Sequence, residues 1–307
     1  MTKVFIDGSA GTTGLRIYDR LAARDDIELL ILPDELRKDI SARKEALHTA
    51  DIAFLCLPDD AAREAVELAN GSNAAIIDTS TAHRTAEGWE YGFAELYGRR
   101  KRIANSKRIA NPGCHASGFI ALVEPLMRAG MIKKNVNLSC FSLTGYSGGG
   151  KKMIAEYEGE DRDKLLDAPR MYGLTQQHKH LKEMVKICGM DTPPIFCPIV
   201  APFYSGMEVT VPVHAKTLGA NIDEVAAVYK SYYKNGLVRF VDAPDERGFL
   251  SAAAFSGRDD MQITVCGNAE RILLVARYDN LGKGASGAAI QNMNILLDCD
   301  EAKGLVI

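Results

Sequence analysis

The amino-acid sequence predicts an α/β protein, in which a doubly wound parallel sheet is followed by an α+β domain with a mixed or antiparallel sheet. In the first 80 residues, short apolar runs alternate with stretches of helical pattern. Continuous apolar runs are typical of strands buried on both faces of a parallel sheet, and their alternation with helices indicates βαβ units. Beyond residue 130 the strand-like segments are longer and partly alternate polar with apolar residues, which favours an antiparallel sheet.

The first half predicts four strands that alternate with three helices. The expected strands are residues 4–6, 27–32, 52–57 and 74–77, and the expected helices are residues 12–23, 41–49 and 61–68. Pro58, Asp59 and Asp60 end the third strand and offer N-cap residues for the helix that follows.

The second half predicts longer strands and fewer helices. The expected strands are residues 135–146, 207–215, 262–266 and 271–278, and the expected helices are residues 175–188, 222–234 and 285–297. The last helix follows the glycine turn that begins at Gly282.

Composition and charge exclude several classes of protein. The 307 residues are 47% apolar, and 37 basic against 40 acidic residues give a net charge of −3. This balance leaves no basic footprint for nucleic acid. The longest apolar run has six residues, whereas a membrane span needs about 18. We therefore expect a cytoplasmic globular protein of two domains with no membrane or nucleic-acid partner.

The seven cysteines include no Cys-x-x-Cys pair. Their odd number and their spacing argue against a disulfide framework and against a cysteine zinc site, so no metal is expected.

A glycine-rich loop follows the first predicted strand and opens the first helix. Gly8, Gly11 and Gly14 have the spacing Gly-x-x-Gly-x-x-Gly. Glycines at this place let the backbone approach a pyrophosphate at the positive end of a helix. Hydroxyl donors are added by Ser9, Thr12 and Thr13. The loop predicts a dinucleotide-binding, Rossmann-type domain.

The choice between NAD and NADP stays open from spacing alone. Asp34 lies 20 residues beyond Gly14, where an acid often binds the ribose hydroxyls of NAD. Arg37 and Lys38 follow within one turn and could hold the 2′-phosphate of NADP.

Cys114 is the predicted nucleophile. It ends the motif Asn-Pro-Gly-Cys and opens an apolar helix. The positive end of a helix lowers the pKa of a cysteine thiol, and neighbouring backbone N–H groups can stabilise an oxyanion. The alternative, a buried apolar cysteine, suits the cysteines within strand-like runs better.

His178 and His180 are the candidates for the acid–base group. On a helix over residues 175–188 they flank the apolar stripe on opposite sides, so they cannot share one role. His180, further from the stripe, is expected to face a wet cleft as the acid–base group. His178 is expected to be packed and to orient it.

Two further segments predict substrate contacts. Tyr146, Ser147 and Lys151 belong to a glycine-rich turn with cations, which favours an anion site. Arg84 follows the fourth strand, at the sheet edge where doubly wound folds bind ligands, and could hold a carboxylate or phosphate.

These motifs, in this order, resemble the short-form branch of the N-acetyl-gamma-glutamyl-phosphate reductases, a family of the semialdehyde dehydrogenase type. The resemblance rests on the glycine loop, residues 111–114, 146–151 and 178–180, and the ending from Asn280 to Asn294. It implies the NADPH-dependent reduction of N-acetyl-glutamyl phosphate to a semialdehyde in arginine biosynthesis, through a thioester on Cys114.

The resemblance also implies a domain arrangement. An NADP-binding domain would comprise residues 1–112 and 284–307, and residues 113–283 would form a catalytic domain that also carries the contacts of a homo-oligomer. Asn292 would lie near the nicotinamide, and Arg37 and Lys38 would contact the 2′-phosphate.

One departure and two rivals accompany this interpretation. The longer branch of the family has His-Arg-His-x-Pro-Glu-Ile, whereas here the histidines are followed by Leu181-Lys-Glu-Met184. Aspartate-semialdehyde dehydrogenases share the thioester chemistry but have Asn-Cys in place of Gly-Cys. A non-enzymatic NADP-sensing protein of the same fold would need no reactive thiol.

Overall fold

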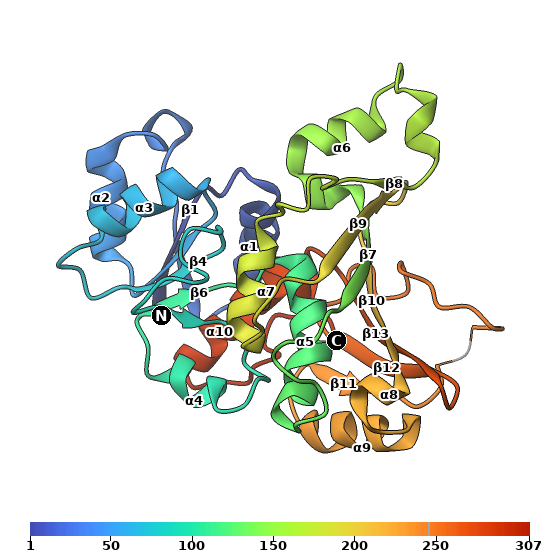
Figure 1. Cartoon of the computed structure of the whole chain (residues 1–307). Helices are drawn as coiled ribbons and strands as arrows, with labels where there is room; N and C mark the ends of the chain where they lie inside the picture. The colour runs from blue at the N-terminus through green and yellow to red at the C-terminus, as the bar shows by residue number, and fades with distance from the viewer. Residues whose placement is uncertain (245) are drawn as a thin grey trace. The chain divides into compact units, whose positions relative to one another are not determined.

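The structure, a computed structural model, describes residues 1–244 and 246–307 (Figure 1). The chain forms two compact units. The first comprises Met1–Pro112 and Ala285–Val306, and the second comprises Gly113–Gly284 with the terminal Ile307.

The first unit contains a six-stranded sheet in which every pair of neighbours is parallel. The strand order is β2-β1-β3-β4-β6-β5. The bounds are β1 Thr2–Asp7, β2 Ile27–Leu30, β3 Ile52–Leu55, β4 Ala75–Asp78, β5 Glu90–Tyr91 and β6 Arg108–Ala110. The predicted parallel sheet is confirmed. β5 and β6 were not predicted, because two or three residues carry too little pattern to be recognised.

Helices cover both faces of this sheet. Their bounds are α1 Thr12–Ala22, α2 Ile40–Thr49, α3 Asp59–Leu68, α4 Arg99–Ala104 and α10 Gly287–Leu296, with the short turn η1 Asp34–Leu36. One apolar cluster joins the sheet to α1, α4 and α10, and the other joins it to α2 and α3. Successive strand residues alternate between them: Phe54 belongs to the first cluster and Leu55 to the second. The unit is doubly wound, as the sequence predicts.

The second unit contains a mixed seven-stranded sheet of order β11-β12-β13-β10-β7-β9-β8. The bounds are β7 Ser139–Gly145, β8 Arg170–Met171, β9 Ile195–Ala201, β10 Met207–His214, β11 Val238–Phe240, β12 Met261–Gly267 and β13 Arg271–Tyr278. The pairs β7–β9 and β11–β12 are parallel, and the other pairs are antiparallel. The expected mixed sheet is confirmed.

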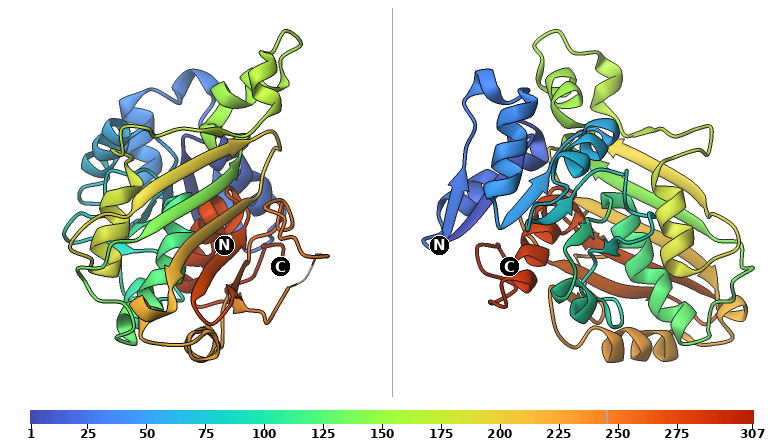
Figure 2. Two further views of the ribbon diagram at one scale, coloured as in Figure 1. Left: turned by 45° about the vertical axis from the view of Figure 1, so that its right-hand side comes forward. Right: turned by 90° about the vertical axis from the view of Figure 1, so that its left-hand side faces the viewer.

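The helices of the second unit gather on one face of this sheet. They are α5 Cys114–Arg128, α6 Gly150–Glu158, α7 His180–Cys188, α8 Ala215–Leu218 and α9 Ile222–Tyr232, with the short turns η2 Tyr146–Gly149 and η3 Lys164–Asp167. α5 packs on β10 and β13, and α7 packs on α5. On the opposite, open face the strands lie side by side (Figure 2), and among the described residues that face exposes large apolar side chains such as Phe141, Ile195 and Leu273. Part of this face at β13 is covered, because Arg277 contacts Glu246 and Phe255 and is only 3% exposed.

The expected helix over residues 175–188 is wrong in its first five residues, because α7 begins only at His180. Gln176 has a left-handed backbone conformation, with φ +57°. Its side-chain amide bonds the backbone N–H and C=O of Phe196 in β9, at 2.9 and 2.7 Å. This side chain therefore ties residues 173–179 to the sheet edge as a loop.

The last predicted helix begins differently as well. A π-type turn, η4 Gly282–Ser286, precedes α10, so the segment changes from turn to helix at Gly287. No helix among the described residues is long and apolar enough to cross a membrane.

Candidate active site

Cys114 is the first residue of α5 and is partly exposed. Gly113, the N-cap residue, has an extended backbone, and its carbonyl accepts bonds from the backbone N–H and the hydroxyl of Ser117. Cys114 thus lies where the positive end of α5 favours a thiolate. Three other cysteines differ: burial raises the pKa of Cys56 to about 12 and also raises the pKa of Cys140 and Cys188.

The two predicted histidines lie next to each other, but their exposure contradicts the expectation. His180 is only 4% exposed, whereas His178 is the more exposed of the two and lies in the loop before α7. The expectation of a wet His180 and a packed His178 is wrong because it placed both residues on one helix. His178 does support its neighbour: its Nδ1 accepts the backbone N–H of His180 at 3.2 Å.

Glu183 connects the histidine helix to the start of α5. It is 1% exposed, and its Oε2 accepts the backbone N–H of Gly113 at 3.2 Å. Its Oε1 lies 3.9 Å from Nε2 of His180. The structure therefore brings the backbone of Gly113, the Glu183 carboxylate and the His180 imidazole together. The sequence prediction did not include Glu183, although its spacing of three residues from His180 on a helix was a usable signal.

The sequence prediction also did not include His115, whose ring packs against the other two histidines. Its Nδ1 and Nε2 lie 2.6 Å from the hydroxyls of Ser142 and Tyr172. Its ring centroid is 5.7 Å from that of His178 and 5.6 Å from that of His180. Burial, reinforced by His178, lowers the pKa of His115 to about 3, so this imidazole is neutral at physiological pH.

The predicted anion loop is held in place by contacts within the second unit. Tyr146 stacks on Tyr157 with ring centroids 4.7 Å apart, and its hydroxyl donates to Glu158. Ser147 is buried, and its hydroxyl accepts from the Asn280 amide at 3.0 Å. Lys151 is exposed in the first turn of α6. Lys151 therefore presents its charge to solvent.

The loop after β13 lies against Cys114. Asp279 accepts the backbone N–H groups of Leu281 and Gly282 through its side chain, and its backbone carbonyl accepts that of Gly284 at 3.0 Å. A Cβ atom placed on Gly284 would come within 3.1 Å of the Cys114 Cβ. This close approach explains the glycine at that position.

In the first unit, the three glycines of the loop after β1 differ in the space around them. Gly8 has φ +88°, and a Cβ there would lie 2.3 Å from the carbonyl oxygen of Cys56. A Cβ on Gly14 would lie 2.4 Å from the carbonyl oxygen of Gly8. Gly11 differs, because its φ is −73° and a Cβ there would approach no protein atom closer than 3.4 Å. The fold requires the first and third glycines, whereas the second leaves room above the N-terminus of α1. Ser9, Thr12 and Thr13 are partly exposed around it.

Arg37, Arg84 and Asn292, also predicted in this unit, have protein partners. Arg37 pairs with Asp34 at 2.7 Å, and Lys38 is exposed beside them. Arg84 donates to the backbone carbonyls of Thr79 and Asn111, each at 2.9 Å. The buried amide of Asn292 donates to the carbonyl of Gly92 at 2.9 Å.

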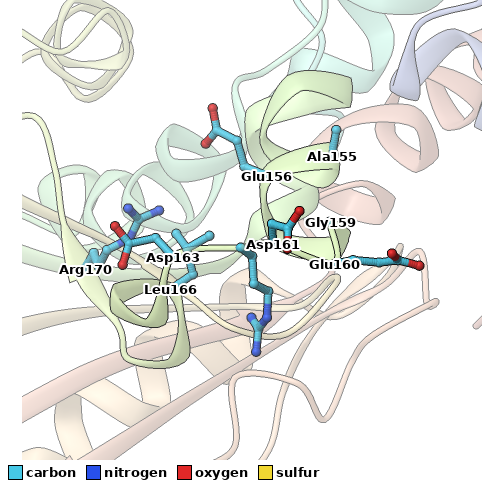
Figure 3. A pocket seen from close by; sticks show the side chains of 9 residues that line it. Ala155, Glu156, Gly159, Glu160, Asp161, Asp163, Leu166 and Arg170 are labelled. Carbon is cyan, nitrogen blue, oxygen red and sulfur yellow. The ribbon is translucent and has the colours of Figure 1, made fainter.

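A separate hollow lies among α6, η3 and the residues just beyond them (Figure 3). It has a volume of about 570 Å³. Its polar lining consists of Glu156, Glu160, Asp161, Arg162, Asp163 and Arg170. None of the predicted site residues lines it.

Comparison with known proteins identifies the class. Residues 33–106 match the family described as semialdehyde dehydrogenase, NAD binding domain, and residues 114–280 match semialdehyde dehydrogenase, dimerisation domain. The fold is similar to aspartate semialdehyde dehydrogenase II from Vibrio cholerae, with a TM-score of 0.74, 17% identity and coverage of 97% of this chain and 99% of that one. An aspartate semialdehyde dehydrogenase with NADP from Candida albicans gives a TM-score of 0.68 at 15% identity, covering 97% and 98% of the two chains. The fold and the site define a nicotinamide-dependent dehydrogenase of the semialdehyde dehydrogenase class.

Curated relatives identify the particular family. The chain is 46% identical to N-acetyl-gamma-glutamyl-phosphate reductase 2 from Nostoc sp., with 99% of each chain covered. It is 44% identical to the N-acetyl-gamma-glutamyl-phosphate reductase from Rhizobium meliloti, covering 96% of this chain and 98% of that one. The chain belongs to the N-acetyl-gamma-glutamyl-phosphate reductase family, and the resemblance seen in its sequence is confirmed.

The neutral His115 generates a pH-dependent stability. A pKa of about 3 in the folded protein, against about 6.5 when unfolded, means that only the unfolded chain binds this proton between those values. This stability is fully present above pH 6.5 and is lost as the pH falls towards 3. From pH 7.5 to 5.5 the loss is about 1.4 kcal/mol in the free energy of unfolding.

Urea unfolding of His115→Gln at these two pH values should therefore show a pH-dependent loss smaller by about 1.4 kcal/mol than in the parent. The matched control is His214→Gln, because His214 is exposed. An unchanged pH dependence in His115→Gln would mean that His115 titrates normally in the folded protein.

Proposed function

We propose that this protein catalyses the NADPH-dependent reduction of N-acetyl-glutamyl phosphate to N-acetyl-glutamate semialdehyde and phosphate, as a step of arginine biosynthesis. The arrangement that carries the proposal is Cys114 at the start of α5, with Glu183 bonded to the backbone N–H of Gly113 and close to His180. The names and the near-complete coverage of the curated relatives support the choice of substrate.

The reaction has two chemical stages. In the first, the Cys114 thiolate attacks the acyl carbon and expels phosphate, which leaves a thioester. In the second, the thioester carbon would be reduced by a hydride that a bound nicotinamide would supply, and Cys114 would leave the resulting thiohemiacetal as a thiolate to give the aldehyde. A proton must leave the thiol before attack and return to it afterwards. We assign this transfer to His180, with Glu183 orienting its ring and His178 holding its backbone.

Substrate contacts are proposed from the second unit's glycine turn and from Arg84. Lys151 is exposed beside a turn of backbone N–H groups and would bind the substrate's phosphate or carboxylate. Ser147 and Tyr146 would shape this site, since their side chains are held by Asn280 and Tyr157. Arg84 is the proposed contact in the first unit.

The cofactor is proposed to be NADP, held by the glycine loop. The residues fit a dinucleotide, because Gly11 lacks a side chain that the protein itself has space for. A pyrophosphate placed there would meet the backbone N–H groups that open α1 and the hydroxyls of Thr12 and Thr13. Asn292, which fixes the backbone at Gly92, would support the nicotinamide end.

The described cysteines are all free thiols, and they number seven. Free thiols suit a reducing compartment, which supports our proposal of a cytoplasmic location.

The function is tested by following NADPH oxidation with N-acetyl-glutamyl phosphate and, separately, with aspartyl phosphate. We expect turnover with the first substrate only, and Cys114→Ser should lower kcat by several orders of magnitude because a serine hydroxyl is a poor nucleophile at pH 7. Cys266→Ser, at a partly exposed position in β12, is the matched control. Preference for aspartyl phosphate would favour the aspartate-semialdehyde dehydrogenase alternative. NADPH binding without any turnover would favour a sensing protein.

Cofactor preference is tested at Arg37 and Lys38. The double variant Arg37→Ala/Lys38→Ala removes two cations that would hold a 2′-phosphate, each charge-assisted bond contributing about 1.5–3 kcal/mol. We expect the Kd for NADPH to rise by at least tenfold while that for NADH changes little, measured by fluorescence titration. Equal weakening of both cofactors would place the 2′-phosphate elsewhere, and Asp34, freed from its pair with Arg37, would become the ribose contact.

We also propose that the open face of the second unit's sheet binds a second copy of this chain. Phe141, Ile195 and Leu273 are exposed on it, and Cys197 lies beside Phe141 by strand register. Large apolar side chains exposed on one face of a sheet are typical of an interface rather than a solvated surface. Sedimentation velocity should show an oligomer, and Phe141→Asp should shift it towards monomer without loss of helix by circular dichroism. A monomeric parent would overturn this proposal.

A further inference from the structure

Tyr278, the last residue of β13, places its hydroxyl inside the first turn of α5. The side chain is fully buried. Its hydroxyl donates to the carbonyl oxygen of Cys114 at 2.6 Å and accepts the backbone N–H of Gly118 at 3.0 Å. These two backbone groups are four residues apart, which is the spacing of a direct hydrogen bond in an α-helix. The Tyr278 hydroxyl bonds both of them where α5 begins, and we call this contact the bridge.

Gly118 is the residue that admits this hydroxyl. A Cβ atom at position 118 would lie 2.6 Å from the Tyr278 hydroxyl and 2.5 Å from Cγ2 of Val209. Glycine is otherwise the least favourable residue for a helix interior after proline. Its presence one turn after Cys114 is explained by the space that the bridge requires.

The bridge has two effects on Cys114. First, the two hydrogen bonds tie the carbonyl of Cys114 and the N–H of Gly118 to the end of β13. In addition, the O–H dipole points its positive end at the Cys114 carbonyl, which reduces the negative potential close to the thiol. Gly284, in the loop after β13, lies against the Cys114 Cβ, so the strand contacts the backbone of the nucleophile and the loop contacts its side chain.

Resting on the function proposed above, we propose that Tyr278 is a positioning residue for the nucleophile: its bridging hydroxyl fixes the direction of the Cys114 thiol and favours the thiolate. Without the hydroxyl, the Cys114 carbonyl would lose its bond to the end of β13, and the start of α5 would be free to shift. Displacement of a reacting group by a fraction of an ångström lowers the rate of chemistry more than it lowers substrate binding.

Two other tyrosines provide matched controls. The hydroxyls of Tyr229 and Tyr233 donate to the carbonyls of Leu122 and Ala121, also in α5. Both tyrosines are buried, and both carbonyls lie about two turns beyond Cys114. Tyr233→Phe therefore removes the same kind of hydrogen bond from the same helix without touching its first turn.

The test compares Tyr278→Phe with Tyr233→Phe in the full-length protein. For Tyr278→Phe we expect kcat to fall at least tenfold with KM within about twofold of the parent. We also expect iodoacetamide to modify the Cys114 peptide at least threefold more slowly at pH 7, as followed by mass spectrometry. Tyr233→Phe should match the parent in both measurements. A merely structural role for Tyr278 predicts equal effects in the two variants, and that result would overturn the proposal.

A second variant guards against poor folding of the first. Gly118→Ala keeps Tyr278 but forces its hydroxyl away from the bridge, so it should reproduce the loss of kcat and the slower alkylation. If either variant, Tyr278→Phe or Gly118→Ala, folds and keeps both kcat and the alkylation rate within twofold of the parent, the proposal is wrong. The alkylation rate needs no substrate. It therefore still tests Tyr278 if the parent fails to reduce N-acetyl-glutamyl phosphate, a result that would overturn only the proposed function.

Discussion

The end of strand β13 is the feature on which the rest of the second unit's site depends. Three consecutive residues, beginning with the last residue of the strand, each fix a different segment of the site. Tyr278 bridges the first turn of α5, Asp279 fixes the loop that returns to Cys114, and Asn280 holds the Ser147 hydroxyl and the backbone N–H of Gly206. These side chains are all buried, and β13 is bonded on both sides by neighbouring strands. A central strand is among the most rigid parts of a protein, so the groups of the site are held in fixed positions relative to one another.

The acid–base side of the site depends on a different kind of contact. Glu183 connects α7 to the start of α5. Its carboxylate accepts the backbone N–H of Gly113 and lies near His180. Beneath them, His115 is kept neutral by burial and fixed by two hydroxyls. An uncharged imidazole in this position packs against its neighbours without repelling a proton that one of them carries.

Much of the fold could be predicted from the sequence, because it depends on local patterns. The parallel sheet follows from uniform apolar runs such as residues 52–57, and the glycine loop from its place after the first strand. The start of α7 could not be predicted, because the side chain of Gln176 bonds a strand that follows nearly 20 residues later. The same reason explains the error on the exposure of His178 and His180. Likewise, the roles of His115 and Tyr278 come from partners between 27 and 164 residues away, which no spacing rule reveals.

The glycine at position 118 has a consequence for attempts to stabilise this protein. Replacing an interior helical glycine by alanine is a standard route to higher stability, with a gain of about 1 kcal/mol in a regular helix. Here the added methyl group would meet a tyrosine hydroxyl and a valine side chain before it met solvent. Helix α5, which begins with the nucleophile, is therefore less stable than a regular helix with alanine at position 118 would be. A gain in thermal stability must come from helices and loops that do not touch its first turn.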